Sequence, residues 1–106
     1  MLDPPAPVGG NVFVYILACS GGAMYVGSSV DVVKRLAEHG GPKGARFTRD
    51  HPGGRLIYIE GPLSITLALK RERQLKRWSR AKKLALARNQ SVVLKKLSRS
   101  REKPRD

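Results

Sequence analysis

The sequence is short of several residue types, and each shortage excludes a class of protein. Its single cysteine, Cys19, excludes an intramolecular disulfide and a cysteine-rich zinc site. No apolar run approaches the ~18 residues that a membrane-spanning helix needs. The leader MLDPPAPVGG has neither the basic nor the apolar region of a signal peptide. We therefore expect a cytoplasmic protein without a membrane partner, and the 106 residues predict one domain with one modest core.

Acidic residues are also scarce, and the imbalance lies at one end of the chain. The sequence has 21 Lys and Arg against 8 Asp and Glu, a net charge of +13. Residues 1–69 carry six basic and five acidic side chains (net +1), whereas residues 70–106 carry fifteen and three (net +12). Such a density attracts polyanions by releasing their counterions. Nucleic acid, whether DNA or RNA, is therefore the leading predicted partner class, with an association with the nucleoid or the ribosome, and binding to an anionic membrane surface fits the same charge.

The first half of the chain has the pattern of two strands, a helix and a third strand. NVFVYILAC and AMYVGSS flank Ser-Gly-Gly, which predicts a hairpin. Helical spacing of apolar residues follows over roughly 31–39, with Asp31 or Ser29 as the cap and Gly40-Gly41 as the stop. The Gly-, Pro- and charge-rich segment 40–54 predicts a long loop of the kind that is usually functional or disordered. RLIYIE at 55–60 predicts a third strand, ended by Gly61-Pro62.

The second half is predicted to be helical. Ser64 is a candidate cap for a helix over about 65–77, and Ser79 for another that ends near Arg88. Trp78, between them, is expected to anchor one helix against the other. The order β-β-α-β-α-α predicts an α/β (α+β) domain with a small three-stranded sheet and helices packed on it. The expected division is a disordered leader (1–10), a domain (11–90) and a basic, partly disordered tail (91–106).

Glu72 stands where the helical pattern predicts an apolar side chain. When residues 65–77 are projected at 100° per residue, Glu72 falls about 20° from Ile65, in the middle of an apolar arc. It is also the only acidic residue between Gly61 and Arg101. Glu72 could simply pair with a neighbouring Arg or Lys. Alternatively, its carboxylate enters a site at the edge of the core, where a hard cation such as Mg²⁺ needs at least one such oxygen.

Two further pairs of residues are suited to phosphate and proton chemistry. Arg35 and His39 stand four apart and therefore share a helix face, although a solvated surface pair would look the same. Two of the three tyrosines, Tyr15 and Tyr25, flank the hairpin turn. They share a face of the sheet if the turn is the three-residue Ser-Gly-Gly, and they lie on opposite faces if it is a two-residue Gly-Gly.

In this order, the residues resemble the GIY-YIG nuclease domain, and the small stand-alone bacterial members in particular. The name-giving tripeptides correspond to Phe13-Val14-Tyr15 and Tyr25-Val26-Gly27, and GARFTR and ALKRERQLKRWSRAKKLAL are also similar to these members. The resemblance covers about residues 11–87. This chain departs from it in having Phe13-Val14 for Gly-Ile. Asn89 is the one candidate for the asparagine that often follows the metal-binding glutamate, and we do not count it as catalytic because it lies past the predicted helix end.

The resemblance implies an endonuclease that hydrolyses DNA phosphodiesters with one Mg²⁺ or Mn²⁺ ion, with branched or damaged DNA in repair or recombination as candidate substrates. Glu72 would hold the metal and Arg35 the scissile phosphate, while Tyr25 or Tyr15 orients or activates water and His39 supports proton transfer. The residues expected to contact nucleic acid are Lys43, Arg46, Arg49, Lys70, Arg73, Arg77, Lys82 and Lys83. A monomer is expected. A non-catalytic nucleic-acid-binding module and a ribosome-associated basic protein stay open as alternatives.

Overall fold

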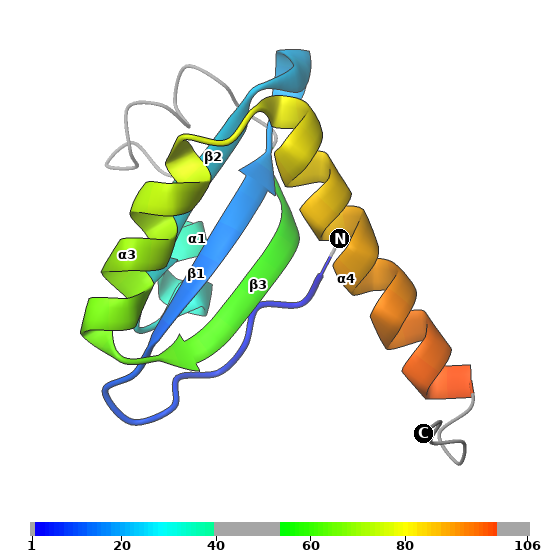
Figure 1. Cartoon of the computed structure of the whole chain (residues 1–106). Helices are drawn as coiled ribbons and strands as arrows, with labels where there is room; N and C mark the ends of the chain where they lie inside the picture. Colours follow the sequence, from blue (N-terminus) through cyan, green and yellow to red (C-terminus); the bar gives the residue numbers. More distant parts are fainter. Residues whose placement is uncertain (1, 40–53, 100–106) are drawn as a thin grey trace.

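The computed structural model describes residues 2–39 and 54–99, without the side chains of His39 and residues 91–99. Figure 1 shows a small sheet with helices on both of its faces. The three strands pair in the antiparallel order β2-β1-β3. Their bounds are β1 (Val12–Ala18), β2 (Met24–Ser29) and β3 (Arg55–Leu63). The described helices are α1 (Val32–His39), α3 (Ile65–Lys76) and α4 (Arg80–Arg99). The predicted α+β class and the order β-β-α-β-α-α are confirmed.

The central strand β1 divides the core into two layers. Its residues alternate between the faces, so Val12, Val14 and Ile16 pack on one side and Phe13, Tyr15 and Leu17 on the other. The first set meets α3 and α4, which lie in front of the sheet in Figure 1, whereas the second set meets α1 behind it. Because both faces of β1 are covered, its sequence is a continuous apolar run instead of an alternating one.

The hairpin between β1 and β2 has the longer of the two possible turns. Cys19 N–H donates to the carbonyl of Ala23 at 2.8 Å, so Ser20–Gly22 (η1) forms a three-residue connection. Gly21 and Gly22 adopt φ values of 75° and 82°, which residues with a Cβ rarely reach. The resulting register pairs Tyr15 with Gly27 and Leu17 with Tyr25. The two tyrosines therefore lie on the same face of the sheet.

The predicted caps are present at the described helix starts. Lys34 N–H donates to Oδ1 of Asp31 at 3.1 Å, Leu67 N–H to Oγ of Ser64 at 3.2 Å, and Lys82 N–H to Oγ of Ser79 at 3.2 Å. Each side chain satisfies an N–H group that the first helical turn leaves without a partner. Asp31, one of the two predicted candidates, is therefore the residue that caps α1.

The predicted C-terminal ends of the last helix and the third strand are wrong. The last helix does not stop near Arg88 but continues to Arg99, so Asn89 lies inside α4. Residues 80–99 contain no glycine or proline, and nothing else in this stretch breaks a helix once it has formed. The third strand does not stop at Gly61-Pro62 but runs to Leu63, which pairs with Val12 across a bulge in the register. A bulge accommodates such residues within a strand that otherwise keeps its pairing.

The outer edge of β3 is covered by side-chain and backbone groups. The Gln90 amide of α4 accepts from the N–H of Ile59 at 3.3 Å and donates to its carbonyl at 2.7 Å. Leu2 N–H donates to the carbonyl of Leu56 at 2.9 Å. These contacts satisfy strand groups that an edge would otherwise expose. They leave β2 as the other edge of the sheet.

Within the described ranges, none of the helices is both long and apolar enough to cross a membrane.

We predict that Ser64→Ala lowers the free energy of unfolding by about 1 kcal/mol, because Leu67 N–H no longer has its capping partner. Chemical denaturation followed by circular dichroism measures the change. Thr66→Ala, at an exposed position of the same helical turn, is the matched control and should change stability by only a few tenths of a kcal/mol. Equal destabilisation by both variants would contradict the capping role of Ser64.

Candidate active site

Tyr15 and Tyr25 form a pair on the α1 face of the hairpin. Their ring centroids lie 6.3 Å apart, with the ring planes inclined by 34°. Tyr15 is fully buried, whereas Tyr25 is partly exposed. The two tyrosines differ in solvent exposure because Tyr15 lies on the central strand β1 and Tyr25 lies on the edge strand β2. Only Tyr25 therefore presents part of its surface to solvent.

Gly27 lets the Tyr15 side chain cross the edge strand. A Cβ at Gly27 would lie 2.7 Å from the Tyr15 hydroxyl oxygen and 2.8 Å from Cε1 of the Tyr25 ring. Both distances are shorter than van der Waals contact allows. The phenol of Tyr15 thus lies directly over Gly27, where any other residue would place a side chain. The glycine of the second tripeptide is needed for this close approach.

Arg35 brings a positive charge to the same place from α1. Burial raises the pKa of Tyr15 far above its usual value, and the neighbouring Tyr25 adds to the increase. The charge of Arg35 and a hydrogen bond with its guanidinium act in the opposite direction. Arg35 also pairs with Glu38 on its own helix, at 3.4 Å between Nε and Oε1. Tyr15 therefore stays protonated at neutral pH and can donate a hydrogen bond.

Glu72 reaches the β2 edge from the opposite face of the sheet. Its Oε1 accepts from Oγ of Ser28 at 2.5 Å, and its Oε2 lies 2.8 Å from Nζ of Lys76. Burial alone would raise the pKa of Glu72. Hydrogen bonds from Lys76 and Ser28 and the positive charges of Lys76 and Arg35 outweigh it, so the pKa lies below its usual range. Glu72 is therefore an ionised, largely covered carboxylate.

The predicted position of Glu72 on α3 needs a correction. Ala68 and Leu75 are the buried residues of this helix, whereas Ile65 and Leu69 are 61% and 49% exposed. The buried stripe is thus turned away from Ile65, and Glu72 lies at its flank instead of its middle. The reason is the size of the sheet: β2 is its edge, so there is no further strand for Ile65 and Leu69 to cover.

A hollow of about 430 Å³ lies along the β2 edge, between α1 and α3. Ser28, Ser29 and Arg35 line it on one side, and Ala68 and Leu69 line it on the other. The charges of Arg35 and Glu72 both act on the Tyr15 hydroxyl although they come from opposite faces. The edge strand is where the two faces meet. Tyr15, Tyr25 and Arg35 thus lie on the α1 side of this edge, whereas Glu72 reaches it from the α3 side through Ser28, so the hydroxyls and the carboxylate do not share one face of the sheet.

Other predicted residues are only partly placed. His39 is the last residue of α1, one turn beyond Arg35, and its side chain lies outside the described part. Lys43, Arg46 and Arg49 also lie outside the described residues. Asn89 is exposed on α4, next to the Gln90 that binds β3, and thus on the far side of β1 from Glu72.

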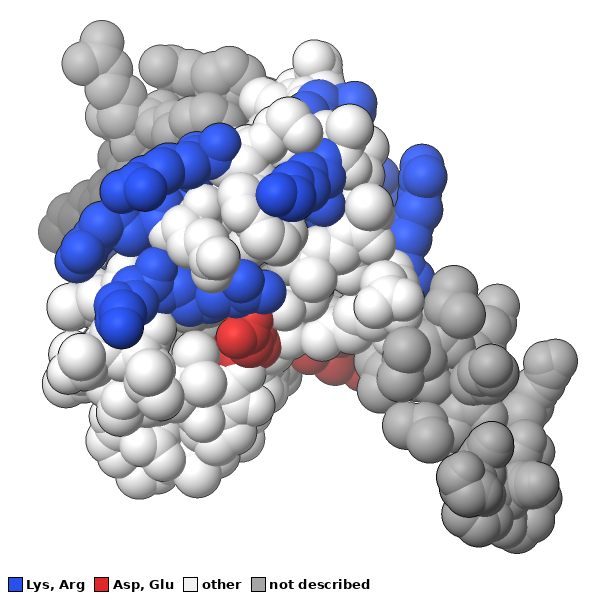
Figure 2. All heavy atoms as spheres, in the orientation of Figure 1, with Lys and Arg blue, Asp and Glu red and all other residues white. Residues whose placement is uncertain are grey.

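The remaining predicted cations gather on α3 and the start of α4. Figure 2 shows Lys and Arg side chains crowded over the α3 side of the face in view, with far fewer acidic atoms among them. Lys70, Arg73 and Arg77 are exposed on or next to α3, as is Lys82 on α4, while Lys83 is half-buried. None of the first three forms an ion pair within the described ranges. They are available to an anionic partner.

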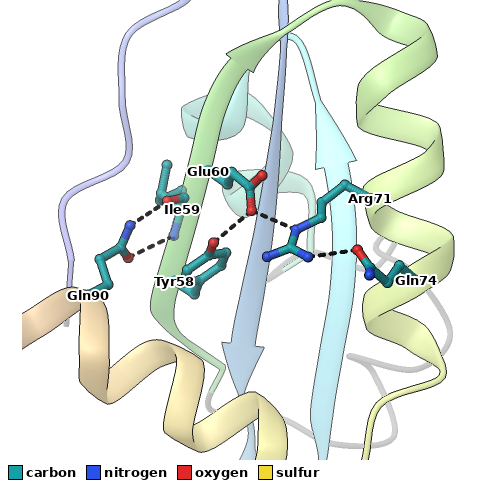
Figure 3. A network of polar contacts seen from close by, with 6 residues as sticks. All are labelled: Tyr58, Ile59, Glu60, Arg71, Gln74 and Gln90. Atoms are coloured by element: carbon teal, nitrogen blue, oxygen red, sulfur yellow. Dashed lines mark hydrogen bonds and ion pairs between the residues drawn. The ribbon is translucent and has the colours of Figure 1, made fainter.

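Arg71, which adjoins Glu72 in the sequence, has a different partner. Its Nε donates to Oε1 of Glu60 at 2.8 Å, and the same oxygen accepts from the Tyr58 hydroxyl at 2.6 Å. Figure 3 shows this network on the β3 side of α3. Of the simple ion-pair partners that the sequence allowed for Glu72, only Lys76 forms a salt bridge with it among the described residues.

Sequence reasoning missed Ser28. The signal was present, because alternation along β2 places Ser28 on the face opposite Tyr25 and Gly27, where α3 packs. Within the part of the chain that the structure describes, no group of three or more His, Cys, Asp and Glu side chains could hold a metal ion. Any cation at this edge would depend on Glu72, with water and substrate oxygens completing its coordination.

Comparisons with known proteins show which family the chain resembles. The family model of the GIY-YIG catalytic domain matches residues 11–85. A UPF0213 protein of Syntrophus aciditrophicus is 44% identical over 75 residues, which make up 70% of this chain and 86% of the relative. One from Haloquadratum walsbyi is 37% identical over 75 residues, 71% and 84% of the two chains. The solution NMR structure of a UPF0213 protein from Bacillus halodurans is 38% identical and covers 72% of this chain and 81% of that one, with a TM-score of 0.47.

We predict that Gly27→Ala destabilises the protein by about 1–3 kcal/mol, the usual range for overpacking, because the new methyl group displaces both tyrosine rings. Thermal unfolding measures the effect. Gly10→Ala, with open space around the added Cβ, is the control and should leave stability nearly unchanged. A Gly27→Ala variant as stable as Gly10→Ala would contradict the close approach of the Tyr15 hydroxyl.

We also predict a loss of stability at high pH that depends on Tyr15. The folded protein holds the pKa of Tyr15 above its unfolded value of about 10, mainly through burial. The resulting stabilisation is complete below pH ~10 and is lost as pH rises toward the folded pKa. The free energy of unfolding should therefore fall less steeply above pH ~10 in Tyr15→Phe than in the wild type. Parallel pH profiles in urea denaturation would contradict this assignment.

Proposed function

Because the chain belongs to the GIY-YIG family of nuclease domains, we propose that it is an endonuclease that hydrolyses DNA phosphodiester bonds with one Mg²⁺ or Mn²⁺ ion. One observation carries the proposal. Tyr15 and Tyr25 pack together at the β2 edge, Arg35 of α1 lines the hollow there, and Glu72 of α3 accepts a hydrogen bond from Ser28 of the same strand. Packing alone does not require a buried phenol, an arginine and an ionised carboxylate at one place.

Arg35 is suited to hold the scissile phosphate. Its planar guanidinium can bind two phosphate oxygens at once, and it lines the open hollow at the β2 edge. Its ion pair with Glu38 is long, at 3.4 Å, and largely exposed, so little free energy opposes an exchange of partners. A phosphate placed there would lie between α1 and α3.

The two tyrosines are suited to different tasks. Tyr15 is buried with a raised pKa, so it acts as a fixed hydrogen-bond donor that positions a substrate oxygen or water. Tyr25 is partly exposed on the edge strand, so we assign it the orientation of the attacking water. His39, one turn beyond Arg35, remains the candidate for assisting proton transfer.

The side chains near Glu72 fit a hard divalent cation. Carboxylate and hydroxyl oxygens are the donors that Mg²⁺ prefers, and Glu72 and Ser28 supply one of each. Lys76 now neutralises one carboxylate oxygen, but its side chain is 56% exposed and can turn away into solvent. When bound, the ion would supply Lewis-acid polarisation of the phosphate and compensation of its developing charge. Glu72 would hold it, and substrate and water would fill its other positions.

The exposed cations of α3 and α4 would hold the substrate backbone. Lys70, Arg73 and Arg77 lie on or next to the helix that carries Glu72, so DNA held by them would lie close to the hollow. Branched or flapped DNA of repair and recombination is the proposed substrate class. The same surface would also serve a non-catalytic binding module, and the Glu72–Lys76 pair favours that alternative because it gives Glu72 a structural partner.

We predict that the wild type nicks supercoiled or branched DNA with Mg²⁺ or Mn²⁺, and that Glu72→Gln lowers the rate at least about 10³-fold, a loss typical of removing a key electrostatic group. DNA affinity should change little, because the α3 cations remain. Gel assays and fluorescence anisotropy, respectively, measure the two quantities.

Asp3→Asn, which removes an exposed carboxylate outside the site, is the control and should cut at the wild-type rate. Equal residual cleavage by Glu72→Gln would mean that the site is misassigned. A wild type that binds DNA and cuts none of these substrates would identify a non-catalytic module.

A further inference from the structure

A second hollow lies on the β3 side of α3, away from the β2 edge. Its volume is about 770 Å³, which is enough for a ligand of nucleotide size or more. Side chains of β3, α3 and the turn before α4 line it: Glu60, Leu63, Leu67, Lys70, Arg71, Arg73, Gln74, Arg77 and Trp78. We call this hollow the α3–β3 groove. It is separate from the candidate active site, which lies across α3.

The floor of the α3–β3 groove is a fixed polar network. Glu60 accepts from both Tyr58 and Arg71, and Nη1 of Arg71 donates to Oε1 of Gln74 at 2.7 Å. Figure 3 shows these side chains joined from β3 to α3. The negative charge of Glu60 is therefore compensated within the groove. The cations without an ion pair in the described residues, Lys70, Arg73 and Arg77, give the rim a net positive charge.

The groove also offers apolar and aromatic surface. Leu67 is 55% exposed, and the half-buried Trp78 also belongs to the lining. Nζ of Lys82 lies 4.5 Å from the centroid of the Trp78 ring, and Cζ of Arg71 lies 5.4 Å from it. Arg71 is held by Glu60, but Lys82 is exposed and can leave the ring. A nucleobase could take its place on the aromatic face.

We propose that the α3–β3 groove binds single-stranded DNA. Lys70, Arg73 and Arg77 would contact successive phosphates, while unstacked bases would cover Leu67 and Trp78. A duplex fits this lining less well, because its bases stay stacked inside and its phosphates would leave the apolar surface exposed to water. Charge complementarity and an aromatic wall in one concave site are the features on which single-strand recognition depends.

This groove would give the proposed nuclease a preference for DNA that carries a single-stranded arm. The α3 helix separates the groove from the hollow that Ser28 and Arg35 line, and its outer surface carries the same cations. A DNA molecule cut at the β2 edge could thus place a single-stranded arm across α3 and into the groove. This preference rests on the proposed function, whereas binding of the single strand does not.

The chain contains one tryptophan, so Trp78 reports on its own groove. We expect oligothymidylate to quench the fluorescence of the Glu72→Gln variant in the absence of divalent metal, and a duplex of equal length to quench it much less. Arg73→Gln/Arg77→Gln should weaken single-strand binding about tenfold. It should also lower the slope of log K against log salt by about 1.4, at ~0.7 for each phosphate that these arginines no longer neutralise.

Arg55→Gln/Arg88→Gln removes two exposed charges outside the groove and is the matched control, with a much smaller expected effect. Lys70→Gln/Arg77→Gln serves as a second groove variant, and circular dichroism confirms that each variant is folded. Equal weakening in groove and control variants, or equal quenching by duplex, would overturn the proposal, as would tighter binding of single-stranded RNA than of DNA. Because no cleavage is measured, an inactive protein would leave this result unaffected.

Discussion

The close approach of the Tyr15 hydroxyl to the backbone of Gly27 is the constraint on which the candidate site depends. Tyr15 belongs to the central strand, where its ring is buried, and its functional group can reach the edge of the sheet only across β2. That crossing is possible because Gly27 has no side chain to occupy the space. The three-residue turn Ser20–Gly22 then sets the register that places Tyr25 on the same face. One glycine and one turn length thus position both phenols.

The edge strand also explains how charges from opposite faces meet. Arg35 is carried by α1 behind the sheet and Glu72 by α3 in front of it (Figure 1), yet each influences the pKa of Tyr15. In the interior of a wider sheet, the strands would keep such groups apart. At β2 they are separated only by the strand itself, and Ser28 bridges to Glu72 from within it. Among the residues that the structure describes, β3 is covered and β2 is open, so this three-stranded sheet has one place for such a site.

Much of this arrangement is predictable from sequence, for identifiable reasons. Tyr15, Tyr25 and Glu72 can be found because the chain has only three tyrosines and because Glu72 is the only acidic residue between Gly61 and Arg101, whereas Arg35 is singled out only by the family resemblance. The hairpin register stays open in the sequence, since a two-residue and a three-residue turn are both compatible with Ser-Gly-Gly, and only tertiary pairing decides between them.

The predicted orientation of α3 is wrong because an apolar arc does not reveal where a sheet ends. The predicted end of α4 is wrong because Asn89 and its neighbours weaken a helix without breaking it. The α3–β3 groove has no sequence signal, since it brings together β3 and a turn that lie far apart along the chain.

The most direct test of the central claim is to locate a bound cation relative to the β2 edge. Mn²⁺ added to the ¹⁵N-labelled protein with a non-cleavable DNA broadens amide NMR signals according to their distance from the ion. We expect broadening centred on Ser28 and Glu72 and extending to Gly27, and its loss in Glu72→Gln. Broadening centred elsewhere, or unchanged in that variant, would contradict the assignment of this edge as the catalytic centre.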